Sequence, residues 1–91
     1  MDTVARTTDN PLRVLRQSRG LRLNDFATLL GIGYGSLSLT ELGGLRDLPP
    51  ALREGLRAIG EDPEAISAAY REWREQKRRE LLAQQMALVG G

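Results

Sequence analysis

The sequence predicts an all-α protein of five helices, with the last helix much longer than the others. Two observations support this prediction. Caps, first-turn prolines and terminating glycines divide the chain into short segments, each with a recognisable start and stop. Within these segments the apolar residues recur at helical spacing, and no segment has the alternating pattern of a strand.

The first three helices are predicted from their boundaries. The first is expected to begin at the cap and first-turn pair Asn10-Pro11 and to end at Gly20. Asn24 is expected to cap a second helix of about seven residues, which ends at Gly31 because glycine tolerates a positive φ. A third helix is expected over residues 35–42, where it stops at a pair of glycines.

Two further helices complete the prediction. Pro49-Pro50 opens the fourth, and Gly60 ends it. Asp62-Pro63-Glu64 combines a cap, a first-turn proline and an early acid, so it predicts the start of a fifth helix of about 25 residues. The apolar stripe that should dock this helix on the others consists of Ile66, Ala69, Tyr70 and Trp73.

Composition excludes several classes of protein. Apolar residues make up 41% of the chain and charged residues 27%, as in an ordinary globular domain. The chain has no cysteine and no histidine, so it lacks thiolate and imidazole ligands and a histidine general base. We therefore expect no metal, no cofactor and no enzymatic activity. The chain contains no apolar run long enough for a membrane span and no signal peptide, which predicts a cytoplasmic protein that does not bind a membrane.

Charge is distributed unevenly, although the net charge is only +1. Residues 10–46 carry five arginines against two acids, residues 47–64 carry two arginines against five acids, and residues 71–80 carry five basic residues against three acids. A nearly neutral chain segregated in this way can present a basic face to a polyanion.

Residues 12–43 resemble the helix-turn-helix domain of the lambda-repressor-like (Cro/XRE) family. The matches, at the family's spacing, are Arg16, Gly20-Leu21, Ala27, Leu30-Gly31-Ile32, Leu37, Glu41 and Gly43. Residues 48–66 are similar to the two helices that complete the family's five-helix domain. The resemblance implies a compact helix-turn-helix domain over residues 10–70. Residues 1–9 are expected to form a flexible tail.

The resemblance also implies roles for individual residues. In the family, the matching arginine and glutamate form a buried ion pair, so Arg16 is expected to pair with Glu41. The positions that face DNA in the major groove correspond to Arg22, Leu23, Tyr34, Gly35, Ser36, Ser38 and Leu39. Arg46 is expected to contact phosphates together with Arg22.

The groove-facing positions depart from the family. Residues 34–42 contain no Arg, Lys, Gln or Asn, the side chains that make most bidentate contacts to bases. One interpretation is that Gly35 lets the backbone approach the groove closely and that Tyr34 bonds a phosphate or a base. Leu23 and Leu39 would then contact thymine methyl groups. The alternative is an exposed apolar patch that binds another protein; it would consist of Leu23, Tyr34, Leu39 and Leu42.

The fifth helix is expected to continue past the domain, over residues 71–91, with apolar residues on two sides. A monomer cannot bury both sides, whereas a two-fold partner can. We therefore predict a homodimer through Leu81, Leu82, Met86, Leu88 and Val89. The alternative is a frayed, disordered tail.

The arginines at 71, 74 and 78 gather on another side of this helix. We expect a solvated face on which Arg71 and Arg79 each pair with Glu75. Contact with the DNA backbone or with an acidic partner is the alternative.

The sequence as a whole predicts a dimeric, sequence-specific regulator of transcription, a repressor, which binds double-stranded DNA through its helix-turn-helix. The alternative function is a protein-interaction module derived from the same fold that does not read bases. Fold alone does not distinguish the two.

Overall fold

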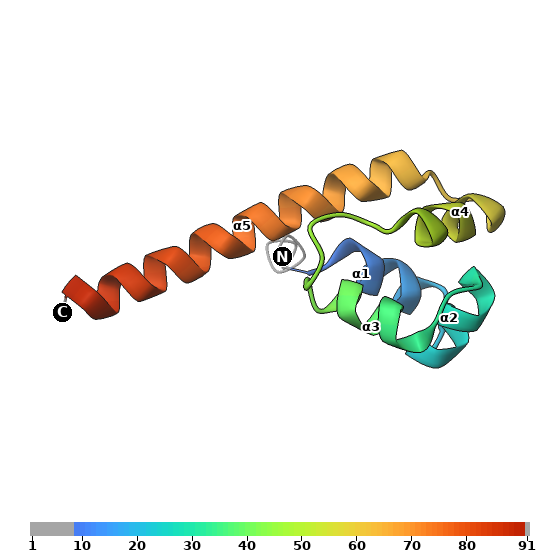
Figure 1. Ribbon diagram of the computed structural model, residues 1–91, viewed down its shortest axis with the longest axis horizontal. Helices are drawn as coiled ribbons and strands as arrows, with labels where there is room; N and C mark the ends of the chain where they lie inside the picture. Colours follow the sequence, from blue (N-terminus) through green and yellow to red (C-terminus); the bar gives the residue numbers. More distant parts are fainter. Residues whose placement is uncertain (1–8, 91) are drawn as a thin grey trace.

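The computed structural model describes the backbone of residues 9–90 and the side chains of residues 9–88, so most of the predicted N-terminal tail lies outside it. Its helices are α1 (Pro11–Ser18), α2 (Leu23–Leu30), α3 (Tyr34–Glu41), α4 (Pro50–Ala58) and α5 (Pro63–Gly90). The described range contains no strand, which confirms the all-α class with five helices. Figure 1 shows α1–α4 gathered at one end of α5, whose C-terminal half projects beyond them. None of the helices described has the length and apolar character needed to cross a bilayer.

Two of the predicted caps form as expected. The side chain of Asn10 accepts a hydrogen bond of 2.9 Å from the backbone N–H of Leu12, in the first turn of α1. Asp62 accepts hydrogen bonds from two backbone N–H groups at the start of α5, at 3.0 and 3.3 Å. Both side chains satisfy amide groups that a helix leaves without a partner at its N-terminus.

The predicted cap at Asn24 is wrong. α2 begins earlier, at Leu23, and its N-cap residue is Arg22, whose side chain makes no capping hydrogen bond. Leu23 packs against the core, and this tertiary contact draws it into the helix, leaving Asn24 exposed in the first turn. α3 is also shifted by one residue toward the N-terminus, because it spans Tyr34–Glu41 and the predicted range was 35–42.

The core lies where α2 packs on α3 and α4, and where α5 packs on α1 and α4. Its buried apolar side chains are Leu12, Phe26, Ala27, Leu30, Leu37, Leu48, Leu52, Leu56 and Tyr70. Ile66 and Trp73 pack against this cluster from α5, as predicted. Ala69 does not: it is exposed in an open groove between α1 and α5, because these helices do not close over it.

Gly55 allows α4 to pass close to the end of α2. Gly55 is buried, and a Cβ atom there would overlap the backbone carbonyl oxygen of Leu30 and lie 3.0 Å from its Cβ. Backbone atoms cannot swing aside as the tip of a side chain can. The contact between α2 and α4 therefore depends on the absence of a side chain at this position.

We predict that Gly55→Ala destabilises the protein by about 1–3 kcal/mol, because overpacking at the α2–α4 contact outweighs the better helix propensity of alanine. The matched control is Gly35→Ala, also within a helix, where a Cβ would have nothing within 4 Å. That change should be neutral or stabilise by up to about 1 kcal/mol. Chemical unfolding of both variants measures the difference, and equal effects would contradict the close approach.

Candidate nucleic-acid interface

α2 and α3 are two eight-residue helices joined by a short turn. Gly31 leaves α2 with a left-handed φ of 74°, a conformation that favours glycine. The backbone N–H of Ile32 then donates to the carbonyl of Ala27 at 3.0 Å. Ala27 itself is buried, and α2 packs against α3. The result is a helix-turn-helix unit.

An ion pair holds the end of α3 against α1. Arg16 and Glu41 form two hydrogen bonds, Nε to Oε2 at 2.8 Å and an amino group to Oε1 at 3.1 Å. The two side chains are only 16% and 5% exposed. Arg16 also donates to the carbonyl of Leu21 at 3.1 Å. The pairing that the family resemblance implied is thus present, with the fork geometry that suits a guanidinium and a carboxylate.

Asn10 makes a second connection between α1 and α3 that sequence reasoning missed. Besides capping α1, its amide nitrogen donates to the carbonyls of Thr40 and Glu41, at 3.1 and 2.9 Å. These carbonyls belong to the last turn of α3, where helical hydrogen bonding ends, and that of Thr40 also accepts from the backbone N–H of Gly43 at 3.0 Å. A single asparagine therefore completes the start of one helix and the end of another.

The outer face of α3 is open to solvent. Its core side contains Leu37, Thr40 and Glu41, and Thr40 is accommodated there because its hydroxyl donates to the carbonyl of Ser36 at 2.8 Å. The predicted DNA-facing residues of α3 lie away from the core: Tyr34, Gly35, Ser36 and Leu39 are exposed and Ser38 is half-buried. Within residues 9–88, the hydroxyls of Tyr34, Ser36 and Ser38 make no hydrogen bond.

Two of the predicted contact residues are less available than expected. Leu23 is half-buried against the core, so it is only partly free for a base or a protein partner. Leu39 is 46% exposed, but its side chain lies over Gly44, where a Cβ would overlap it. The most exposed apolar residues in this region are therefore Tyr34 (54%) and Leu42 (73%).

The N-termini of α2 and α3 lack side-chain caps. Their N-cap residues are Arg22 and Gly33, and neither makes a capping hydrogen bond. The first-turn amide groups of both helices are consequently left to water or to an added acceptor. Arg22 is exposed at the start of α2 and adds a positive charge beside these amides.

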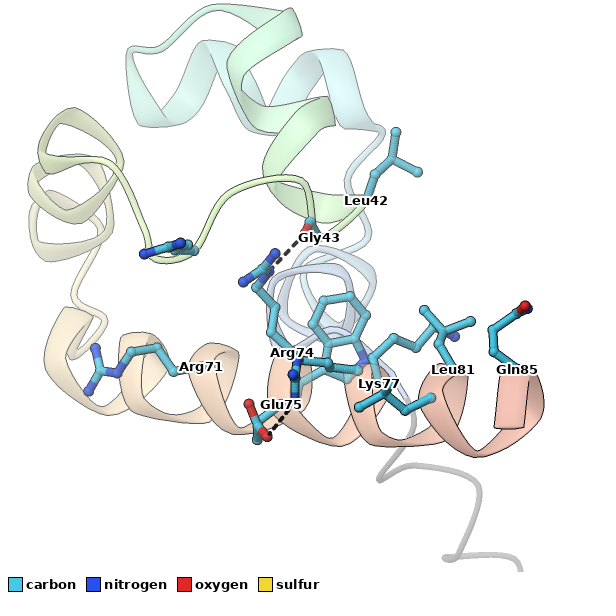
Figure 2. Close-up of a pocket in the computed structure, with 12 residues that line it drawn as sticks. Leu42, Gly43, Arg71, Arg74, Glu75, Lys77, Leu81 and Gln85 are labelled. Carbon is cyan, nitrogen blue, oxygen red and sulfur yellow. Dashed lines mark hydrogen bonds and ion pairs between the residues drawn. The ribbon is translucent and has the colours of Figure 1, made fainter. Parts of the chain in front are cut away.

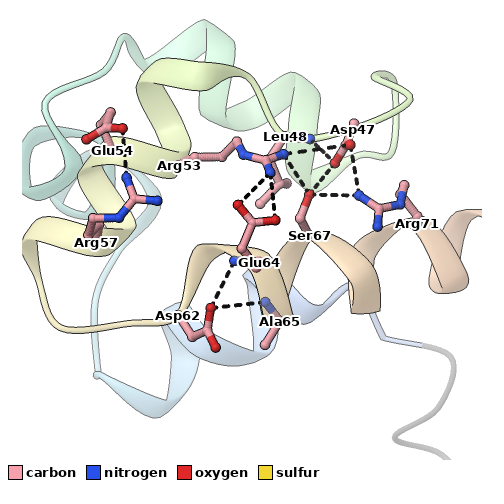
Figure 3. A network of polar contacts seen from close by, with 10 residues as sticks. All are labelled: Asp47, Leu48, Arg53, Glu54, Arg57, Asp62, Glu64, Ala65, Ser67 and Arg71. Carbon is pink, nitrogen blue, oxygen red and sulfur yellow. Dashed lines mark hydrogen bonds and ion pairs between the residues drawn. The ribbon is translucent and has the colours of Figure 1, made fainter.

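The loop between α3 and α4 is tied to α5 by a polar network (Figure 3). Asp47 accepts hydrogen bonds from the Ser67 hydroxyl, from the backbone N–H of Leu48 at 2.7 Å and from Arg71 at 2.9 Å. Burial raises the pKa of Asp47, but these hydrogen bonds and the charge of Arg71 lower it more, so the pKa lies below its usual value. Arg53 brings α4 into the network through a 3.1 Å hydrogen bond to Ser67.

Tyr70 fastens this loop to α5, and Arg46 is exposed on it. The hydroxyl of Tyr70 donates to the carbonyl of Leu45 at 2.6 Å, and burial raises the pKa of Tyr70, which keeps the proton in place. Arg46 is exposed on the fastened loop and makes no hydrogen bond or ion pair within the described residues. A rigid loop thus presents a free cation close to the end of α3.

A groove of about 770 Å³ separates this loop from α5 (Figure 2). Its apolar surface comes from Leu42, Trp73, Leu81 and Leu82. Its charged lining consists of Arg46, Arg71, Arg74, Lys77 and Arg78 against a single acid, Glu75.

The charged residues of α5 are only partly as predicted. Arg71 pairs with Asp47, not with Glu75, because the α3–α4 loop crosses α5 at that point. Arg74 donates to the carbonyl of Gly43 at 2.9 Å instead of standing in solvent. The predicted pair between Glu75 and Arg79 is present at 3.9 Å, and Arg78 lies 3.8 Å from the same carboxylate.

The described side chains among the predicted dimerisation residues are not buried within one chain. Leu81, Leu82, Met86 and Leu88 are all exposed on the projecting half of α5, while the side chain of Val89 lies outside the described residues. The described backbone is helical as far as Gly90, so it does not have the frayed tail that was the alternative expectation.

Comparisons with protein-family models, with curated proteins and with solved structures found no match for this chain.

We predict that Arg16→Ala destabilises the protein by about 3–5 kcal/mol, because it leaves Glu41 charged and buried without its partner. The matched control is Arg19→Ala. Arg19 pairs with Glu61 at 2.6 Å, but both side chains are about one-third exposed, so its loss should cost less than about 1 kcal/mol. Thermal unfolding compares the two variants, and a near-neutral Arg16→Ala would refute the structural role of the pair.

The Asp47 network predicts a dependence on pH. A carboxylate with a lowered pKa stabilises the fold above its unfolded pKa, and this contribution disappears as the pH falls through the folded pKa. Asp47→Asn should therefore be less stable than the wild type at neutral pH, by less than about 1 kcal/mol because the site is partly exposed. The difference should be constant down to about pH 4 and shrink below it. Urea unfolding from pH 7 to pH 2.5 would test this, and a difference that grows in acid would contradict it.

Proposed function

We propose that this protein is a cytoplasmic, sequence-specific DNA-binding regulator of transcription, a repressor of the Cro/XRE type, which places α3 in the major groove and acts as a dimer. The observation that carries the proposal is the free outer face of α3 on a rigid helix-turn-helix unit. α3 is buttressed on its inner side by the Arg16–Glu41 pair and by Asn10, while its outer side stands in solvent.

The chemistry of this face suits close contact with DNA. Gly35 has no side chain, and a Cβ there would meet nothing within 4 Å, so the backbone of α3 is open at this point and can approach the base edges. The hydroxyls of Tyr34, Ser36 and Ser38 have no partner among residues 9–88, and a hydroxyl can both donate to and accept from bases or phosphates. The methyl groups of Leu39 offer an apolar contact to thymine.

Affinity would come mainly from phosphates. Arg22 and Arg46 are exposed at two edges of the unit, one before α2 and one after α3. The uncapped N-termini of α2 and α3 add amide donors and the positive end of each helix dipole, which favour anions. Phosphate contacts fix the position of the protein on the duplex, and the α3 face would supply the specificity.

Selection from a random pool of duplex DNA at near-physiological salt tests the proposal. We expect enrichment of an inverted repeat whose half-sites lie about one helical turn apart, as two-fold dimers of helix-turn-helix proteins require. Binding without enrichment would leave only phosphate contacts and refute sequence-specific reading. Absence of binding at low salt would refute the DNA function altogether.

Variants sharpen the same experiment. Arg22→Ala and Arg46→Ala should each weaken binding to all sequences and lower the salt dependence of the logarithm of the affinity by about one unit. The matched control is Arg57→Ala: Arg57 is exposed on α4 and paired with Glu54 at 2.7 Å, so its loss should leave DNA binding unchanged. Equal effects of all three changes would indicate non-specific attraction only.

A second candidate function rests on the exposure of Tyr34, Leu39 and Leu42, since apolar patches of this kind mark protein-binding surfaces. In that case α3 would dock on another protein. A partner that still binds while DNA affinity is absent at low salt would identify this function in place of the first.

A further inference from the structure

We propose that two copies of the protein associate through antiparallel pairing of α5, in which the uncharged C-terminal part of each α5 occupies the groove between α5 and the α3–α4 loop of the other copy. The proposal specifies the dimer that the proposed function uses, but it does not depend on DNA binding.

Both walls of the groove carry apolar side chains that are exposed in a single chain. Leu81 and Leu82 are 50% and 45% exposed on α5, and Leu42 is 73% exposed on the opposite wall. Figure 2 shows Leu42 and Leu81 on different elements with open space between them. An added helix lying along α5 would touch both walls at once.

The sequence of α5 identifies this added helix as a second α5. Residues 71–80 contain five basic and three acidic residues, whereas residues 81–90 contain no charged residue. In a parallel pair the two basic segments would lie side by side and repel each other. In an antiparallel pair centred near Leu81 and Leu82, each charged segment lies beside the uncharged segment of the other copy.

The dimensions agree with this register. The groove is lined by α5 residues from Arg71 to Gln85. With the two-fold axis near Leu81 and Leu82, residues 83–90 of the second copy run alongside residues 73–80 of the first. Met86 and Leu88 of the second copy, exposed in one chain, then reach the part of the groove that holds Leu42.

Charge complementarity favours the same arrangement. The last turn of a helix carries unpaired carbonyl groups and the negative end of the dipole. In the antiparallel pair, this end of α5 comes next to Arg71 and Arg74 of the other copy, within a lining of five basic residues and one acid. Gln84 and Gln85 supply further oxygen acceptors there for Lys77 and Arg78.

Cross-linking tests the direction of pairing. The chain has no cysteine of its own, so each introduced thiol is unique. In the proposed register Arg78 of one copy faces Gln85 of the other, whereas two Gln85 residues lie about 10 Å apart along the axis, too far for a disulfide. Under mild oxidation, Gln85→Cys alone should stay unlinked, and a mixture with Arg78→Cys should give the mixed dimer. Self-linking of Gln85→Cys without the mixed product would overturn the antiparallel arrangement.

Sedimentation equilibrium tests the association itself. At tens of micromolar the wild type should have twice the 10.1 kDa mass of one chain. Leu81→Glu should weaken the dimer at least tenfold by placing a charge in the apolar contact. The matched control is Ala83→Glu, which adds the same charge two residues on and nearly opposite on the helix, and it should leave the dimer intact.

The remaining outcomes separate this inference from the proposed function. A wild type that sediments as a monomer overturns the inference and leaves the basic groove to an acidic partner protein. Equal weakening by Leu81→Glu and Ala83→Glu also overturns it, because the contact would then not lie on the Leu81 side. A dimer with the expected cross-links but without DNA affinity would support the inference while refuting the DNA function. Circular dichroism of each variant verifies that the helices remain folded.

Discussion

The attachment of α3 to α1 is the interaction on which the rest of the structure depends. Arg16 on α1 and Asn10 at the N-cap of α1 hold the carboxylate of Glu41 and the final carbonyls of α3. α3 contributes only one large apolar side chain to the core, that of Leu37, so hydrophobic burial alone would hold it weakly. The polar contacts at its C-terminal end supply the remaining stabilisation. The opposite face of α3 is therefore not needed to hold the helix in place.

Because the inner side of α3 makes the structural contacts, its outer side can have an unusual composition without loosening the helix. The outer face of α3 carries glycine, serines and a tyrosine, none of which is needed for packing. On the other side of the turn, Arg22 and the uncapped amide groups are the groups that would bind phosphates in the proposed function. Exposed basic residues thus lie beside α2 and α3, at Arg22 and Arg46, and also line the groove along α5.

Local signals in the sequence were sufficient for most of the fold. The caps at Asn10 and Asp62 and the turn at Gly31 depend on neighbouring residues, so their structural roles can be predicted from the letters alone. Features set by tertiary contacts could not be predicted. Leu23 enters α2 because of the core, and Arg71 turns to Asp47, 24 residues earlier in the chain, because the α3–α4 loop crosses α5 there. The positions of the candidate DNA contacts followed from the family pattern, but the folding of Leu39 over Gly44 did not.

The junction between α3 and α5 has a mechanical consequence. Gly43, with a φ of 84°, presses its backbone against the ring of Trp73, where a Cβ would lie only 2.8 Å from the ring carbons, and its carbonyl accepts from Arg74. α5 then continues without a break into its projecting half. These contacts join the end of α3 directly to α5. In the proposed assembly, this junction would fix the separation of the two α3 helices. An operator with a lengthened or shortened spacer would then have to bend or twist to be bound, and this deformation of the DNA costs free energy.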